Sequence, residues 1–220
     1  MDGIHDMGGT QGWGTVTIPP EEPVFPEPWQ AKAFAFGALS ARLSGQNLDA
    51  MRHAIDRMHP YDYLADGYYG RWLGCTEIML VDSGVLAPGA VEARARRLRG
   101  EQVEEPPVGE PHKPDYKPTA GGSLRTTDRT VRFKVGDRVR AKARGPSGHT
   151  RLTRFTRGHV GTVHAIQPAQ VLPDTHAHFV AENAQPVYAV RFDSTELWGP
   201  DAERFSVTID CYDDYLEPAE

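Results

Sequence analysis

Apolar residues between positions 29 and 99 recur at steps of three and four, which is the spacing of one face of an α-helix. This spacing predicts a helix from Trp29 that ends before Gly45, a second that begins at the N-cap Asn47, a third over about 67–82 and a short fourth with Pro88 near its first turn. The apolar face of the first consists of Ala31, Phe34, Ala35, Ala38, Leu39 and Leu43. That of the second consists of Leu48, Met51, Ile55 and Met58. We therefore expect a helical domain over residues 29–100.

The apolar period changes to two in the last 90 residues of the chain. It predicts strands over 133–140, 161–166, 187–192 and 207–212. Short alternating strands separated by Gly, Pro and Asp turns are typical of a small, strongly bent antiparallel barrel. The predicted fold class is α+β, with an SH3-like antiparallel β-barrel over residues 131–220.

Two segments show neither period. Residues 1–28 combine many glycines and prolines with large apolar residues such as Trp13, Ile18 and Phe25. Such a segment cannot bury its own apolar groups, so we expect an extended arm that wraps a partner subunit. Residues 101–130 are rich in proline and charge, and we expect a linker there.

Composition narrows the class of protein. The chain has 220 residues, 39% of them hydrophobic, which is enough for one large or two small cores. No apolar run of about 18 residues suggests a membrane span, and acids occupy the N-terminus where a signal peptide would be basic, so we expect a cytoplasmic location. Cys75 and Cys211 lack metal-ligand or redox spacing and are predicted to be buried packing residues.

Positive charge is concentrated in one part of the chain. Residues 131–160 hold nine Lys or Arg and one acid, whereas residues 161–220 hold two Arg and eleven acids. Because the net charge of the whole chain is −6, nonspecific binding to nucleic acid is disfavoured. A few placed arginines that hold one defined anion are the better interpretation, with Arg151 and Arg157 favoured over Arg154, which we expect on a solvated face.

No pattern announces a catalytic centre or metal site within this chain. Nine histidines are present, but none has helical ligand spacing with a third ligand, so no metal is assigned to these residues. Motifs for a serine nucleophile, a zinc protease or a phosphate-binding loop are absent. A non-enzymatic alternative is an SH3-like module for RNA binding or assembly, suggested by GDRVR followed by GHVGTV; few aromatic residues near the basic run speak against it.

Several long motifs follow one another along nearly the whole chain: MDGIHDMGG, MRHAIDRMHPYDYLADGYYGRWL, GHTRLTRFTRGHVGTV, PDT within VLPDTHAH, YAVRFDSTELWG and CYDDYLEP. Together they resemble the beta subunit of nitrile hydratase. The resemblance implies an alpha-beta heterodimer, assembled into a heterotetramer, that hydrates a small nitrile to its amide. The implied metal is Co(III), in preference to Fe(III) because Trp72 is similar to the cobalt members, and the alpha subunit holds it through a loop with two oxidised cysteines.

The resemblance also implies roles for residues of this chain. Arg52 and Arg151 are the implied catalytic pair, which hold the oxidised cysteines of the alpha subunit, and Arg157 is a weaker candidate. The implied substrate-binding residues are Leu48, Met51, Tyr68 and Trp72, and Tyr68 also acts through its hydroxyl. Gly37 and Met51 stand where some relatives carry aromatic residues. A subunit of thiocyanate hydrolase, which shares this architecture, is the alternative enzyme.

Overall fold

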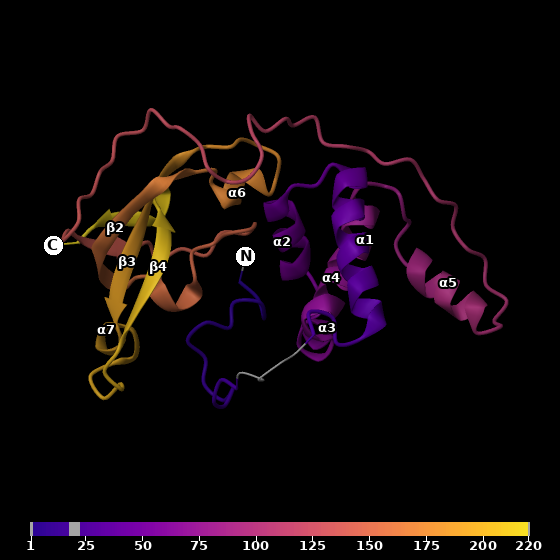
Figure 1. Ribbon diagram of the computed structural model, residues 1–220, viewed down its shortest axis with the longest axis horizontal. Coiled ribbons are helices and arrows are strands. Elements are labelled where there is room, and N and C mark those ends of the chain that lie inside the picture. The colour runs from indigo at the N-terminus through magenta and orange to yellow at the C-terminus, as the bar shows by residue number, and fades with distance from the viewer. Residues whose placement is uncertain (1, 18–22, 220) are drawn as a thin grey trace. The chain divides into compact units, whose positions relative to one another are not determined.

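The computed structural model describes residues 2–17 and 23–219, which divide into two compact units (Figure 1). The helical unit consists of residues 12–115 together with residues 3–5. The sheet unit consists of residues 116–219 together with Asp2 and residues 6–11. Each unit is described by itself. The combination of helices with an antiparallel sheet confirms the α+β class.

Five helices form the helical unit: α1 (Pro28–Ser44), α2 (Leu48–Asp56), α3 (Pro60–Ala65), α4 (Gly67–Asp82) and α5 (Ala90–Leu98). The local signals for the first two are confirmed. Gly45 ends α1 in the left-handed conformation at φ 71°, and the Asn47 side chain accepts hydrogen bonds from the amides of Asp49 and Ala50. The short α3 was not predicted, and α5 begins after Gly89 at φ 79°, so Pro88 precedes the helix and does not lie in its first turn.

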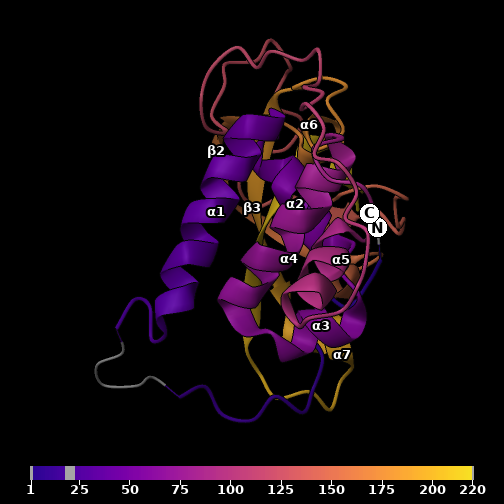
Figure 2. The same cartoon turned by 90° about the vertical axis from the view of Figure 1, so that its right-hand side faces the viewer.

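Helix α1 packs against α4 through small side chains (Figure 2). Its buried residues are Ala33, Gly37, Ser40 and Ser44, whereas Leu39 is 66% exposed and Leu43 is 46% exposed. The face on which the sequence places the large apolar residues therefore points largely to solvent. Close approach of two helices explains the result, because a face of small residues lets backbones come together where large side chains would hold them apart.

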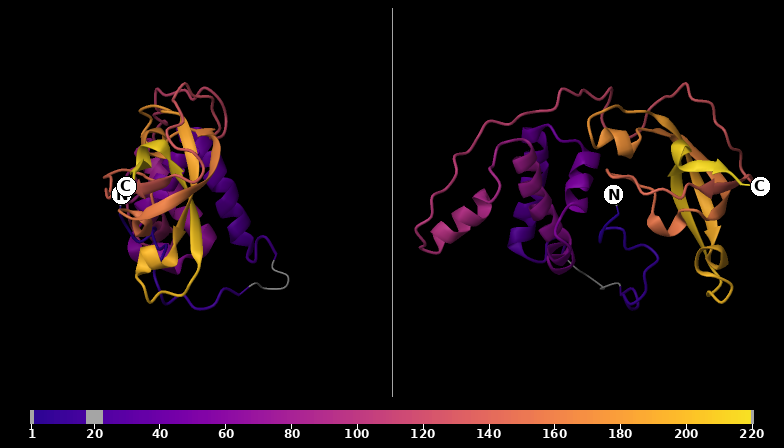
Figure 3. Two further views of the ribbon diagram at one scale, coloured as in Figure 1. Left: turned by 90° about the vertical axis from the view of Figure 1, so that its left-hand side faces the viewer. Right: turned by 180° about the vertical axis from the view of Figure 1, so that it is seen from behind.

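An antiparallel sheet forms the sheet unit (Figure 3). Its five strands lie in the order β4-β3-β2-β1-β5. The strands are β1 (Arg138–Ala141), β2 (Val160–Gln170), β3 (Gln185–Asp193), β4 (Ser206–Tyr212) and β5 (Leu216–Pro218). Helices α6 (Pro173–His176) and α7 (Ser194–Trp198) and the 3-10 turns η1 (Arg154–Thr156) and η2 (Asp213–Tyr215) connect them. Edge strands β4 and β5 are not paired with each other in the described chain, so a closed barrel is not confirmed.

The first strand starts later than its period of two predicts. Gly136 has φ 95° and the amide of Asp137 donates to the carbonyl of Lys134, so residues 134–137 form a turn before β1 begins at Arg138. The core of the sheet unit contains large side chains from most strands, among them Val139, Val163, Phe192 and Leu216, all nearly inaccessible to solvent. Cys75 and Cys211 are fully buried in their respective units, which confirms their packing role.

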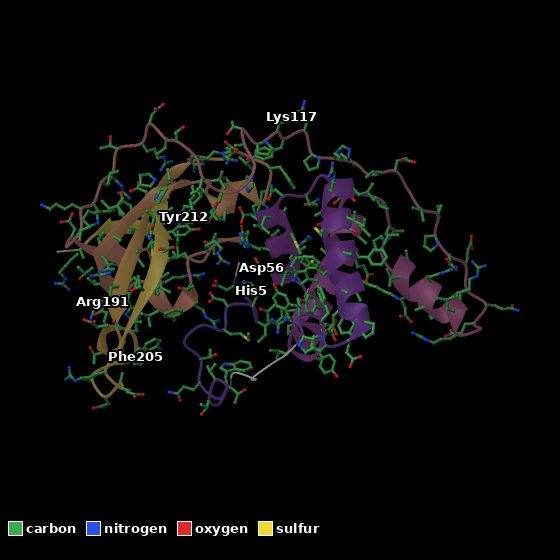
Figure 4. The ribbon with its side chains drawn as sticks, in the orientation of Figure 1. His5, Asp56, Lys117, Arg191, Phe205 and Tyr212 are labelled. Carbon is green, nitrogen blue, oxygen red and sulfur yellow. The ribbon has the colours of Figure 1, made fainter. Side chains whose placement is uncertain are left out.

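The predicted arm and linker form no long helix or strand in the described part. Residues 2–17 are irregular, with Trp13 and Val16 exposed, and Ile18 lies outside the described residues. In the helical unit, His5 Nε2 lies 3.6 Å from Asp56 Oδ1 (Figure 4). In the sheet unit, Arg125 is held by Glu182 and three carbonyls, so this stretch of the predicted linker is fixed to the sheet unit. No described helix is both long and apolar enough to cross a membrane.

Candidate functional site

Arg52 lies on α2 and is oriented by the acid one turn before it. Its Nη1 donates to Oδ1 of Asp49 at 2.8 Å, and the Asp49 side chain is only 6% exposed. Asp49 in the first turn also faces the positive end of the helix dipole. The Arg52 side chain stays 41% exposed, so donors other than Nη1 remain available for an anion outside the helical unit.

Aromatic rings gather along α4 and the neighbouring part of α1. The Trp72 ring centroid lies 6.2 Å from that of Tyr68 and 5.0 Å from that of Phe34. Tyr68 is 64% exposed, whereas its neighbour Tyr69 donates its hydroxyl to the carbonyl of Val24. Tyr68 and Trp72, predicted together from the sequence, therefore form one surface with an apolar wall and a phenolic hydroxyl.

Gly37 decides how close this aromatic surface lies to α1. A Cβ atom placed on Gly37 would meet Cε3 of Trp72 at 2.8 Å, which is closer than real contacts allow. The indole of Trp72 therefore packs directly on the backbone of α1. This direct packing therefore depends on the missing side chain at Gly37.

The other two predicted substrate residues differ in burial. Met51 is 7% exposed and belongs to a small core cluster with Ala54, Cys75 and Met79, against which Trp72 packs. Leu48 is 59% exposed. The helical unit also contains a cavity of about 1000 Å³ along α3 and α4, whose lining includes Trp29 and Val91. None of the predicted substrate residues lines this cavity.

Arg151 lies in a loop before η1 that is fixed from several sides within the sheet unit. Its backbone amide donates to the hydroxyl of Tyr215 at 3.1 Å, and the amide of His149 donates to Nε2 of His178 at 3.1 Å. At the start of the loop, a Cβ atom on Gly148 would meet Nε2 of His178 at 2.2 Å, so any other residue there would displace the His178 ring. The backbone around Arg151 is therefore held by contacts far apart in sequence.

Two of the three arginines in this loop contact acids near the N-terminus. Arg157 donates from Nη1 to Oδ1 of Asp2 at 2.5 Å and from Nη2 to the carbonyl of Leu152 at 3.0 Å. The backbone amide of Arg154 donates to Oδ2 of Asp6 at 2.8 Å. The Arg157 hydrogen bond lowers the pKa of Asp2. The basic run thus has neutralising acids, contrary to the interpretation from local sequence, and they come from the N-terminus.

Arg151 is the exception within this loop. Its side chain is exposed, and no hydrogen bond or ion pair joins its guanidinium to a residue in the described part of the chain. A fixed backbone with an exposed, forked cation is suited to a carboxylate, sulfinate or similar oxyanion on another molecule. Arg52 and Arg151 belong to different units, so each is placed only within its own.

Sequence reasoning missed the residues that hold this loop. Tyr215 accepts the amide of Arg151 and donates its hydroxyl to Oδ2 of Asp174. Burial raises the pKa of both Tyr215 and Asp174. Asp174 occurs in the motif PDT and Tyr215 in the motif CYDDYLEP. These motifs indicated the family resemblance but assigned no role to either residue. In the structure, Tyr212 of the second motif ends β4, just before η2 (Figure 4).

Comparisons with known proteins match this chain along its length. Residues 1–119 match the family described as nitrile hydratase beta subunit, N-terminal, and residues 122–218 match its C-terminal counterpart. A nitrile hydratase subunit beta from Pseudomonas putida is 40% identical over 100% of both chains. A cobalt-containing nitrile hydratase subunit beta from Pseudonocardia thermophila is 35% identical over 99% of this chain and 96% of that protein.

Among solved structures, a thiocyanate hydrolase from Thiobacillus thioparus aligns with 29% identity and a TM-score of 0.39. The alignment covers 41% of this chain and 78% of that chain. A superposition at this score supports no functional argument.

Proposed function

Because the chain belongs to the nitrile hydratase beta-subunit family, we propose that it works with a metal-bearing alpha subunit to hydrate a nitrile to the corresponding amide. The full-length match carries this proposal. The alignments cover at least 96% of each of the two nitrile hydratase beta subunits reported above, so they include both units of this chain.

Arg52 and Arg151 are the residues we propose to hold the oxidised cysteines of the alpha subunit. The support is their availability, since the Arg151 guanidinium has no partner in the described chain and Arg52 uses only Nη1 on Asp49. Each charged hydrogen bond to a sulfur-bound oxygen is worth roughly 1.5–3 kcal/mol. The two arginines would hold these anionic oxygens in place throughout turnover. Arg157, which bonds Asp2 and Leu152, is better suited to support the loop.

The substrate surface that we propose consists of Leu48, Met51, Tyr68 and Trp72. The exposed hydroxyl of Tyr68 beside the Trp72 ring would orient the nitrile, while the apolar side chains exclude water around it. Gly37 lets Trp72 pack directly against α1, and we propose that the substrate occupies the space on the other side of the ring. The size of that space would set which nitriles are accepted.

The metal that we propose for the complex is cobalt, which the name of the Pseudonocardia thermophila relative includes. The donors offered by Arg52 and Arg151 suit anionic oxygens around a metal and not the metal itself, so the ion would belong to the alpha subunit as Co(III). When bound, it would supply Lewis acidity to the hydration. We further propose that the complex is a heterotetramer in the cytoplasm.

We also propose that the sheet unit is an SH3-like barrel. The support is that the pairing register of β2 shifts after Val163 and after Gln167, as at β-bulges, which bend a strand.

Co-expression of this chain with a cysteine-rich alpha subunit tests the function. We expect a complex that contains cobalt and hydrates acrylonitrile but does not hydrolyse thiocyanate. The chain expressed alone, under the same cobalt supply, serves as the control and should retain no stoichiometric metal and show no hydration. Preferred turnover of thiocyanate, or hydration by the isolated chain, would contradict the proposal.

A further inference from the structure

The hydroxyl of Tyr215 joins three elements of the sheet unit at one point. It accepts the backbone amide of Arg151 at 3.1 Å and lies 3.3 Å from Oγ1 of Thr150, which donates to it. Its own proton is directed to Oδ2 of Asp174 on α6. A phenol has one donor and two acceptor positions, so this arrangement uses all of them.

The ring that carries this hydroxyl cannot move easily. Tyr215 is 1% exposed and packs edge-on against Tyr212 with ring centroids 5.4 Å apart. It lies on η2, between β4 and the edge strand β5. The core of the sheet unit therefore fixes the position of this hydroxyl, and the hydroxyl in turn fixes the backbone of the loop through the Arg151 amide.

We propose that Tyr215 and Asp174 are positioning residues that fix the backbone of Arg151, and through it the point from which the guanidinium reaches the partner's anion. The inference rests on the function proposed above for Arg151. Asp174 acts one step further away: its carboxylate accepts the hydrogen bond that the Tyr215 hydroxyl donates, which leaves both lone pairs of that hydroxyl for the loop.

Two further hydrogen bonds hold the neighbouring carbonyl of the same segment. Arg157 donates to the carbonyl of Leu152 from Nη2 at 3.0 Å and from Nε at 3.3 Å. Loss of the Tyr215 hydroxyl would release the amide side of Arg151 while this carbonyl stays bound. We therefore expect a loop that remains folded but whose Arg151 side chain starts from a less defined position.

The chain contains a closely matched control. Tyr188 is also fully buried in the sheet unit, its hydroxyl accepts the amide of Arg132 at 3.0 Å, and it donates to Oδ1 of Asp213 at 3.1 Å. Both tyrosines thus join an arginine amide to an aspartate within one core. In the described chain, the Tyr215 hydroxyl contacts the loop of Arg151 and the Tyr188 hydroxyl does not, so Tyr215→Phe and Tyr188→Phe separate positioning from general stability.

The experiment compares the two variants in the complex co-expressed with the alpha subunit. For Tyr215→Phe we expect kcat to fall about tenfold or more with KM changed less than about twofold, because misplaced catalytic geometry costs rate more than binding. Amide hydrogen exchange in a peptide that spans residues 149–153 should become at least about tenfold faster, since the Arg151 amide loses its acceptor. Tyr188→Phe should lower Tm about as much as Tyr215→Phe does, but it should leave kcat and the exchange of residues 149–153 unchanged.

Two results would overturn the inference: normal kcat in Tyr215→Phe, or an equal loss of kcat in Tyr188→Phe. If Tyr215→Phe does not assemble, Asp174→Asn replaces it, and it must show the same faster exchange over 149–153 for the inference to survive. Failure of the proposed function would show in the wild-type complex, which would then not hydrate a nitrile. Failure of the role proposed for Arg151 would show as normal turnover by Arg151→Lys, whatever the exchange in the Tyr215 variant.

Discussion

The helical unit and the sheet unit bury their apolar residues in opposite ways. In the sheet unit, large side chains such as Tyr188, Phe192 and Leu216 are fully inaccessible. In the helical unit, α1 buries alanine, glycine and serine against α4 and exposes Phe36 and Leu39. The sheet unit thus derives hydrophobic stability from its own core, whereas the helical unit leaves much apolar surface uncovered.

Charge does not follow this division, because both units contain internal ion pairs. The helical unit pairs Arg57 with Asp82 and Arg96 with Glu101. The sheet unit pairs Arg125 with Glu182, Arg132 with Asp213, and Arg157 with Asp2. Within the loop, Arg157 is paired with Asp2, whereas no described residue pairs with the guanidinium of Arg151. The partner of each cation in the structure is informative, whereas a count of basic residues in the sequence is not.

The largest effect on stability should come from the core of the sheet unit. Phe192 is fully buried on β3, so Phe192→Ala should lower the free energy of unfolding by about 3–5 kcal/mol. Leu39→Ala on the exposed face of α1 is the matched change and should shift it by less than about 0.5 kcal/mol. Urea unfolding of both variants measures the contrast, and equal losses would show that the two units bury apolar residues alike.

The next largest effect should be on kcat, from the two arginines proposed to hold the oxidised cysteines. Arg151→Lys and Arg52→Lys should each lower kcat about 100-fold, since an ammonium cannot reproduce two forked hydrogen bonds to an oxyanion. Arg154→Lys, in the same loop, keeps the backbone contact to Asp6 and should stay within about threefold. Steady-state kinetics on the assembled complex would refute the role if both first variants turned over normally.

A smaller effect should follow from filling the space under Trp72. For Gly37→Ala we expect a loss of about 1 kcal/mol in stability, because overpacking costs about 1–3 kcal/mol and helix propensity returns about 1 kcal/mol. The displaced indole should also change KM among nitriles of different size. Combining Gly37→Ala with Trp72→Phe should cost less than the sum of the single changes; strict additivity in thermal unfolding would exclude the contact.

The smallest effect should be a pH dependence in the sheet unit. Hydrogen bonds from Arg125 lower the pKa of Glu182 from 4.5 to about 2. A carboxyl with a lowered folded-state pKa stabilises the fold above its unfolded pKa, and this contribution is lost as the pH falls from about 4.5 towards 2. Thermal melts at several pH values should show a shallower acid loss for Glu182→Gln than for wild type. The exposed Glu203→Gln should leave the acid profile unchanged.

Local signals in the sequence predicted much of the fold. The N-cap at Asn47, the left-handed Gly45 and the apolar period of α4 concern residues within a few positions of one another. The strands β2, β3 and β4 also lie where the period of two places them. The short elements α3, η2 and β5 were missed because three to six residues carry too little period to be recognised.

The candidate site divides in the same way. Motifs in the sequence were sufficient to single out Arg52, Arg151, Tyr68 and Trp72, because each belongs to a continuous stretch with a recognisable resemblance. Their surroundings were not predictable. The acids that pair with the basic loop are about 150 positions away, and Asp174 meets Tyr215 across 41 positions.

What the sequence by itself determined is the set of helices and strands, the α+β class and the arginines that merit attention. Tertiary structure alone decided which face of α1 is buried, which arginines are neutralised, and that a tyrosine near the C-terminus holds the backbone of Arg151. The physical reason is range. Backbone propensity and capping act between neighbours in the chain, whereas close packing, ion pairs and buried hydrogen bonds depend on which distant residues folding brings together.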